Sequence, residues 1–153
     1  MDSHTYPPDW ADPLVTGRHR VLTHTPLGAY PDAASAKRGG DSPCARSLNG
    51  TWAFKLTRSP SDMPSGFPGG SRQDSDWLEL AVPSNWQLDE RVDDNPIYTN
   101  VAYPFQPHPP APPDVNPTGW YRTTFEVPGH WHGRRLFLLF ESCDSACRVW
   151  VNG

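Results

Sequence analysis

Residues 51–57 read Thr-Trp-Ala-Phe-Lys-Leu-Thr and come directly after the turn dipeptide Asn49-Gly50. In this stretch large apolar side chains alternate with small or polar ones, and the large ones are Trp52, Phe54 and Leu56. Alternation with a period of two is typical of a β-strand that buries one face. The stretch therefore predicts a half-buried strand, with Thr51, Ala53, Lys55 and Thr57 on the other face.

Further strand patterns follow along the chain. Residues 77–82 are predicted as a second strand that ends at Pro83, and residues 120–127 as a third. Residues 136–140, Leu-Phe-Leu-Leu-Phe, are apolar on both faces, which predicts a fully buried central strand. Residues 145–151 alternate again. Together these segments indicate an all-β sandwich.

Composition agrees with this class. The chain has 153 residues and contains 19 Pro and 12 Gly, together with 7 Trp, 5 Tyr and 6 Phe. Disordered chains lack so many aromatic residues, and helical bundles do not tolerate so many prolines. Residues 104–117 contain seven of the prolines, so this stretch is expected to cross the surface in an extended conformation.

The charge balance of 13 basic and 17 acidic residues gives a net charge of −4, which argues against nucleic acid or an anionic membrane as a partner. No apolar run approaches the ~20 residues of a transmembrane helix, and residues 1–9 have no signal-peptide pattern. If residues 143–147 form a strand, Cys143 and Cys147 lie about 13 Å apart, too far to bridge. Reduced thiols and a cytoplasmic location are therefore expected.

Residues 1–46 are predicted to form an irregular arm, with one short helix at Asp32–Arg38 that Asp32 caps and Gly39 ends. At the other end, Val149-Trp150-Val151 leads into Asn152-Gly153. Asn-Gly after a strand is a strong hairpin signal, yet no return strand follows. An unpaired edge is a liability in a sandwich. We therefore expect an N-terminal piece of a longer protein, incomplete at its C-terminus.

The residues by themselves give few candidates for chemistry. His130 and His132 share one side of a segment, but without a third ligand they are interpreted as surface residues. The carboxyl pairs Asp93-Asp94 and Asp9/Asp12 lie in turn-like, solvated sequence, where no raised pKa suits either pair to glycoside hydrolysis. Residues 107–113 are rich enough in proline for an SH3-like groove, a minor alternative.

Several short motifs together point to one family. They occur in register over most of residues 9–153: Trp10-Ala11-Asp12-Pro13, Arg46-Ser47-Leu48-Asn49-Gly50-Thr51-Trp52, Val82-Pro83-Ser84-Asn85-Trp86-Gln87, Asn95-Pro96-Ile97-Tyr98-Thr99-Asn100-Val101, Tyr103-Pro104-Phe105, Asn116-Pro117-Thr118-Gly119, Phe140-Glu141-Ser142-Cys143-Asp144-Ser145-Ala146 and Val149-Trp150-Val151-Asn152-Gly153. The chain resembles the N-terminal sugar-binding domain of the large bacterial β-galactosidases of glycoside hydrolase family 2.

This resemblance implies a jelly-roll β-sandwich over residues 47–153, truncated, after an N-terminal arm at 1–46. In the family, a TIM barrel further along the chain carries two catalytic glutamates. Such a barrel needs about 250 residues, so this chain cannot contain it. The resemblance thus implies the non-catalytic front of a retaining β-galactosidase that removes terminal non-reducing β-D-galactose from galactosides such as lactose. The chain alone is expected to be inactive.

The resemblance also implies specific site residues. Asn100 matches an asparagine that the first domain projects into the active site to hold galactose, and a carboxamide suits vicinal hydroxyls; the bland alternative is a turn-capping residue. Asp9, Asp12 and Val15 match part of a peripheral Mg²⁺ site, and Na⁺ is also expected in the full-length enzyme. The arm resembles a segment that contacts other subunits, which implies a homo-oligomer.

One departure affects the loop before Asn100. The family usually has a Gly-Tyr-Asp turn where this chain has residues 88–95, Leu-Asp-Glu-Arg-Val-Asp-Asp-Asn. Trp86 is interpreted either as a sugar-stacking ring or as a buried sandwich residue. Two other classes of function stay open: a stand-alone carbohydrate-binding module, and a proline-rich interaction protein.

Overall fold

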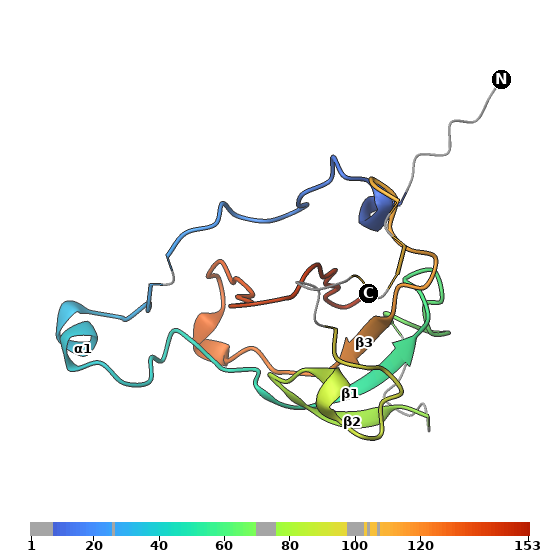
Figure 1. The fold of residues 1–153 in the computed structure, drawn as a ribbon. Helices are drawn as coiled ribbons and strands as arrows, with labels where there is room; N and C mark the ends of the chain where they lie inside the picture. Colours follow the sequence, from blue (N-terminus) through green and yellow to red (C-terminus); the bar gives the residue numbers. More distant parts are fainter. Residues whose placement is uncertain (1–7, 26, 70–75, 98–102, 104, 107) are drawn as a thin grey trace.

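The computed structural model describes residues 8–25, 27–69, 76–97, 103, 105–106 and 108–153. Its three strands form one small antiparallel sheet with the strand order β2-β1-β3, and α1 lies away from this sheet (Figure 1). The strands are β1 (Gly50–Thr57), β2 (Leu78–Val82) and β3 (Thr118–Arg122). The helices are α1 (Ala33–Arg38) and the 3₁₀ turns η1 (Asp9–Ala11), η2 (Trp86–Leu88) and η3 (Gly129–Trp131). No helix of the described part is long and apolar enough to cross a membrane.

One face of the sheet carries the main core. Phe54 pairs with Leu78 on one side and Tyr121 on the other, so their side chains share a face. Phe54 is fully buried, and its ring centroid lies 4.9 Å from that of Tyr121. Buried Leu80 and Val92 complete the cluster. This is the face that the alternation in residues 51–57 predicts.

The opposite face is also covered, by aromatic side chains that the sequence analysis does not place there. Trp120 of β3 is buried and pairs with Lys55 of β1. The ring of Phe67 packs edge-on against Trp120, with the ring centroids 5.0 Å apart. Trp150 packs edge-on against Phe67 at 5.2 Å. The Arg122 guanidinium lies 4.8 Å from the ring centre of Trp77, a cation–π geometry. The sheet therefore has an apolar layer on each side.

The all-β class is confirmed, and the small antiparallel sheet is consistent with an incomplete sandwich. The first and second predicted strands correspond to β1 and β2. The predicted helix is α1: the Asp32 carboxylate accepts a 2.7 Å hydrogen bond from the Ser35 amide, and Gly39 follows at φ 69°. The described residues contain one sheet, so the jelly-roll topology stays a prediction.

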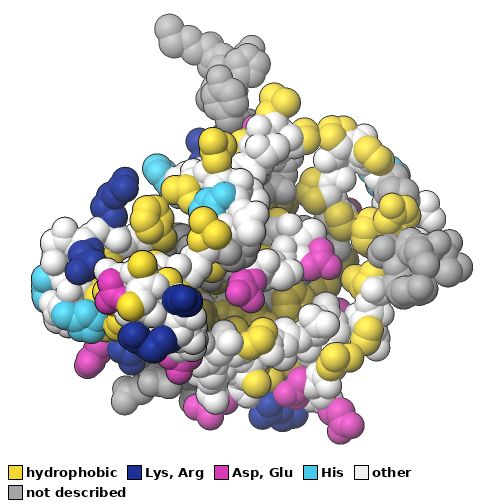
Figure 2. Space-filling model, turned by 90° about the vertical axis from the view of Figure 1, so that its left-hand side faces the viewer, with side chains coloured by type: hydrophobic (Ala, Val, Ile, Leu, Met, Phe, Trp, Pro, Cys, Tyr) yellow, Lys and Arg dark blue, Asp and Glu magenta, His cyan; other side chains and the backbone are white. Residues whose placement is uncertain are grey.

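Three strand predictions are wrong or too long in the described structure. β3 ends at Arg122 instead of 127, and residues 136–140 and 145–151 form no strand. The 136–140 segment is exposed rather than buried, with Phe137 at 64% and Leu139 at 68%. An apolar run becomes a strand only where a neighbour pairs with its backbone, and no described strand pairs with these residues. Figure 2 shows hydrophobic side chains standing at the molecular surface.

The segment from residue 104 to 117 is only partly as predicted. Its described residues contain no named strand or helix, as expected for a proline-rich crossing. However, His108 and Ala111 form an isolated bridge, with the Ala111 amide donating to the His108 carbonyl at 2.8 Å. The chain therefore makes a tight turn within the crossing rather than running straight.

The described residues of the arm, from Pro8 onward, run away from the sheet to α1, and the chain then returns to the sheet at β1 (Figure 1). Their described part contacts the C-terminal third of the chain at separate points. The Trp131 indole donates to the Pro43 carbonyl at 2.9 Å, and Arg46 donates to the Glu126 carbonyl at 3.0 Å. Arg148 forms an ion pair with Asp9 at 3.1 Å. These contacts join distant parts of the sequence.

Candidate functional site

The loop after β2 is built on the main core. Trp86 in η2 places its ring 5.9 Å from that of Phe54 and 6.5 Å from that of Tyr121. Its indole N–H donates to the Asp94 carboxylate at 2.6 Å. Of the two interpretations of Trp86, the structure supports a core residue, because its ring is engaged by the cluster around Phe54.

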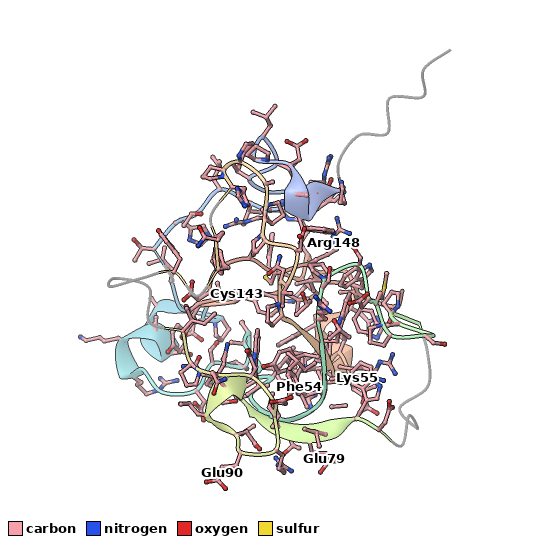
Figure 3. The ribbon with its side chains drawn as sticks, turned by 45° about the vertical axis from the view of Figure 1, so that its right-hand side comes forward. Phe54, Lys55, Glu79, Glu90, Cys143 and Arg148 are labelled. Atoms are coloured by element: carbon pink, nitrogen blue, oxygen red, sulfur yellow. The ribbon has the colours of Figure 1, made fainter. Side chains whose placement is uncertain are left out.

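An arginine fork fixes the middle of the same loop. The Arg91 guanidinium donates to both Asp89 carboxylate oxygens, at 2.9 and 2.7 Å, and to the Glu79 carbonyl at 3.0 Å. These hydrogen bonds hold the pKa of Asp89 at about 2. Beside them Val92 is buried at 8% exposure. In Figure 3, Glu79 and Glu90 stand at the outer edge of this region, whereas Phe54 lies among packed side chains.

The loop thus carries the chain from the core toward the predicted sugar-binding residue. Asn100 itself lies outside the described residues, so its position is not assigned. Its nearest described neighbours, Ile97 and Tyr103, are 49% and 60% exposed. The segment that leads to residue 100 is therefore held to the core by Trp86 and Asp94, and it reaches the surface at Ile97.

Directly after this stretch lies a shallow hollow of about 300 Å³. Its lining combines aromatic rings, proline rings and two polar side chains, and comprises Tyr103, Phe105, Gln106, His108, Pro109, Pro110, Ala111 and Pro113. The Tyr103 and Phe105 rings lie 5.7 Å apart with their planes tilted by 36°. Aromatic faces beside amide and imidazole groups are chemically suited to a sugar ring, which has apolar C–H faces and polar edges.

The predicted metal residues lie together at the start of the arm. Asp9 opens η1, and the Val15 amide donates to the Asp12 carbonyl at 3.0 Å. The Asp12 carboxylate accepts from the Leu14 amide at 2.9 Å. Both Asp9 oxygens face Arg18, at 2.7 and 3.0 Å. Arg148 adds its contact from the far end of the chain, as described above.

These surroundings do not fit a magnesium centre as they stand. The hydrogen bonds and charge of Arg18, with a smaller part from Arg148, hold the pKa of Asp9 below its usual range. Two guanidinium groups therefore occupy the Asp9 carboxylate that a hard cation would need. Within the described ranges, no three His, Cys, Asp or Glu side chains cluster as metal ligands.

The histidines and carboxyl pairs considered in the sequence analysis have no arrangement suited to catalysis in the described structure. A ring nitrogen of His130 lies 3.3 Å from the Pro43 carbonyl, beside the Trp131 contact, so this histidine lies against the arm. Asp94 of the Asp93-Asp94 pair accepts from Trp86. Where carboxyl pKa values are displaced in the described part, at Asp9, Asp32, Asp76 and Asp89, they are all lowered. A glycosidase general acid requires the opposite shift.

Sequence reasoning did not find the residues that contact the candidate site residues. Arg18 is separated from Asp9 by a turn and irregular chain, and Arg148 lies near the other end of the sequence. No local pattern connects such residues. The Trp86–Asp94 hydrogen bond is equally absent from any local pattern, because it joins two ends of the loop that replaces the family's Gly-Tyr-Asp turn.

Comparison with known proteins assigns the class. Residues 45–153 match the family described as "Glycosyl hydrolases family 2, sugar binding domain". The match covers most of the chain and includes all three strands and the loop at Trp86. The chain therefore belongs to this family, as its motifs predicted.

Individual relatives carry a common name. The chain is 41% identical over 145 residues to a "Beta-galactosidase" of Psychromonas ingrahamii, and 39% identical over 145 residues to one of Vibrio vulnificus. A "Beta-galactosidase" of Enterobacter cloacae is 37% identical over 146 residues. Each alignment covers 95% of this chain and 14% of the relative, so the chain spans about one seventh of the length of these relatives.

Proposed function

We propose that this chain is the N-terminal, sugar-binding part of a β-galactosidase that removes terminal non-reducing β-D-galactose from β-galactosides such as lactose. The observation that carries the proposal is the 37–41% identity to proteins named β-galactosidase over 95% of the chain. The whole activity belongs to a longer protein in this proposal, because the aligned region is 14% of those relatives.

In this proposal the chain contributes binding and not bond cleavage. A retaining glycosidase uses two carboxyl groups about 5–5.5 Å apart, one of them kept protonated. The carboxyl pKa values that are displaced in the described part, at Asp9, Asp32, Asp76 and Asp89, are lowered, which favours placing both catalytic groups outside this chain. Asn100 would hold galactose through its carboxamide, which offers two donors and an acceptor. The chain alone is then inactive, and the host enzyme is cytoplasmic.

The arm is assigned assembly contacts in the same proposal, within a homo-oligomer. Within this chain, three arm residues contact the C-terminal part: Arg46 contacts Glu126, Pro43 contacts Trp131, and Asp9 contacts Arg148. Mg²⁺, with Na⁺, is proposed for the full-length enzyme. At Asp9, Asp12 and Val15 the cation would have to displace Arg18 and Arg148 first.

A chimera tests this proposal. Residues 1–153 replace the aligned segment of the Psychromonas ingrahamii relative, and galactoside hydrolysis is measured before and after the substitution Asn100→Ala. The expected result is an active chimera whose kcat/KM falls on substitution by about 10–200-fold, the worth of about 1–3 kcal/mol. Asn95→Ala, at an exposed position of the same stretch, is the matched control and leaves kcat/KM unchanged.

An inactive but folded chimera would contradict the assignment to this activity. Equal kinetics for Asn100→Ala and Asn95→Ala would contradict the role of Asn100 alone. Folding of each chimera is checked by the cooperativity of its thermal unfolding, so that loss of activity is not confused with loss of structure.

The second candidate function is a carbohydrate-binding module, and the hollow at Tyr103 and Phe105 favours it. In this alternative the isolated chain binds galactose or a galactoside by stacking the sugar on one of these rings. Calorimetric titration of the 153-residue chain separates the two candidates. Heat that disappears in Tyr103→Ala supports the module, and absence of binding at millimolar sugar excludes it.

A further inference from the structure

The strand β2 lies at one edge of the described sheet, with β1 as its neighbour in the order β2-β1-β3. An edge strand presents a row of N–H and C=O groups that can pair with a strand of another chain. The sequence of β2, Leu-Glu-Leu-Ala-Val, contains no proline and one charged residue. A segment of this kind is prone to such pairing, so we examined how its outer edge is covered.

Two backbone carbonyls of β2 accept hydrogen bonds from side chains outside the sheet. The Arg91 guanidinium donates to the Glu79 carbonyl at 3.0 Å, and the Ser84 hydroxyl donates to the Ala81 carbonyl. In an antiparallel ladder, the backbone groups of alternate residues point away from the partner strand. Glu79 and Ala81 are two residues apart, so their backbone groups point to the same side of β2. Both hydrogen bonds therefore cover one edge, the edge away from β1.

The loop that supplies Arg91 is fixed by contacts of its own. The Arg91 guanidinium donates to both Asp89 carboxylate oxygens, and the Arg91 amide donates to the Asp89 carboxylate at 3.0 Å. The next residue, Val92, belongs to the main core, and its amide donates to the Asp89 carbonyl at 2.9 Å. The Arg91 side chain is 57% exposed and is nevertheless held against β2. An approaching strand would have to break these hydrogen bonds.

The same edge carries negative charge. Glu79 and Glu90 have exposed side chains, and both stand at the outer rim of β2 and its loop in Figure 3. A second copy of the chain presents the same two residues. Antiparallel pairing of β2 with β2 about a two-fold axis would therefore bring like charges together, which is unfavourable. The covered carbonyls and the like charges oppose the same contact.

We propose that Arg91 and Ser84 cover the outer edge of β2 and thereby prevent it from pairing with β2 of a second copy of this chain. The two side chains occupy the carbonyl acceptors that an incoming strand needs, and Asp89 holds Arg91 in place. The second copy is the relevant partner, because identical strands are self-complementary about a two-fold axis. This inference goes beyond the proposed function and does not depend on sugar binding.

Removal of both covering side chains tests the proposal. The double variant, Ser84→Ala with Arg91→Ala, is compared with the unchanged 153-residue chain by sedimentation velocity at a series of chain concentrations. Its association constant is expected to be higher by about tenfold or more, the equivalent of one to three net hydrogen bonds. Arg58→Ala, at an exposed position after β1, is the matched control, because it removes one arginine charge and is expected to leave association unchanged.

Two further measurements identify the surface that associates. Ala81→Pro, added to the double variant, removes an outward-facing N–H but no hydrogen bond of the β1–β2 ladder, so it is expected to reverse the association. The amides of Glu79 and Ala81 are expected to exchange with solvent more slowly in the concentrated double variant than in the dilute one. The cooperativity of unfolding is checked for every variant.

Two results would overturn the proposal. The first is a double variant that unfolds cooperatively and associates no more than the unchanged chain. The second is association that survives Ala81→Pro while the amides of Glu79 and Ala81 exchange as fast as in the dilute sample, because the contact then lies elsewhere. If the double variant does not unfold cooperatively, Ser84→Ala alone replaces it, with an increase in association expected and no increase counting against the proposal.

Discussion

Gly119 is a position where adding one methyl group should destabilise the fold. It lies in β3 opposite Leu56, on the face that carries the main core. A Cβ atom built there would stand 2.8 Å from Cε2 of Phe54 and 3.0 Å from two ring atoms of Trp86. Neither ring moves freely, because Phe54 is fully buried and Trp86 is tied to Asp94.

The magnitude follows from the cost of overpacking. Carbon atoms in contact prefer separations of about 3.5–4.0 Å, so these approaches require the rings or the strand to shift. Inserting a methyl group into a packed core costs about 1–3 kcal/mol. For a domain of 150–250 residues, each kcal/mol lowers Tm by about 2–4 °C. Gly119→Ala is therefore expected to lower Tm by about 2–12 °C.

Urea unfolding of the 153-residue chain, followed by tryptophan fluorescence, measures the effect. Gly129→Ala is the matched control, because no atom lies within 4 Å of a Cβ built there. Combining Gly119→Ala with Phe54→Leu should recover part of the loss, with a coupling of about 0.5–3 kcal/mol. A change below about 0.5 kcal/mol for Gly119→Ala, typical of surface substitutions, would refute the close-packing argument.

Three further predictions concern charged and polar contacts. Asp9→Asn removes the ion pairs to Arg18 and Arg148 and should therefore speed proteolysis of the arm, whereas the control Asp41→Asn should not. Because the pKa of Asp9 is lowered in the folded chain, the contact is fully present above the carboxyl's ordinary pKa. It is lost as the pH falls through the lowered pKa. Arg91→Met should return the pKa of Asp89 from about 2 toward about 3.9, measured by NMR titration, and no change would contradict the arginine fork. Trp86→Phe keeps an aromatic ring, although a smaller one, and loses the hydrogen bond to Asp94. The expected cost is about 1–3 kcal/mol in urea unfolding, and a neutral result would contradict that bond's contribution.

Local sequence was sufficient where the determinants are local. The alternation at Trp52, Phe54 and Leu56 predicted β1 and its buried face, because side chains of a strand point alternately to its two sides. The cap at Asp32 and the glycine at 39 predicted α1, because both act within one turn. The family was likewise accessible from motifs in register, and the match over residues 45–153 confirms it.

Local sequence failed where an element needs a distant partner. The run at 136–140 is apolar enough for a buried strand, but no described strand pairs with it and its side chains are exposed. β3 stops at Arg122 for a related reason: residues 123–125 pair with no described strand and instead line, together with residues 46–52, a hollow of about 170 Å³. Hydrophobicity indicates that a segment prefers burial, but it does not indicate which other part of the chain will cover that segment.

The candidate sites show the same division. The sequence by itself determined the family, the all-β class and the residues that resemblance selects, Asn100, Asp9, Asp12 and Val15. Only the tertiary structure decided that Asp9 pairs with Arg18 and Arg148, and that Trp86 packs against the core. The physical reason is that these contacts depend on how the backbone bends between the partners. Periodicity and spacing describe the chain only while it stays regular.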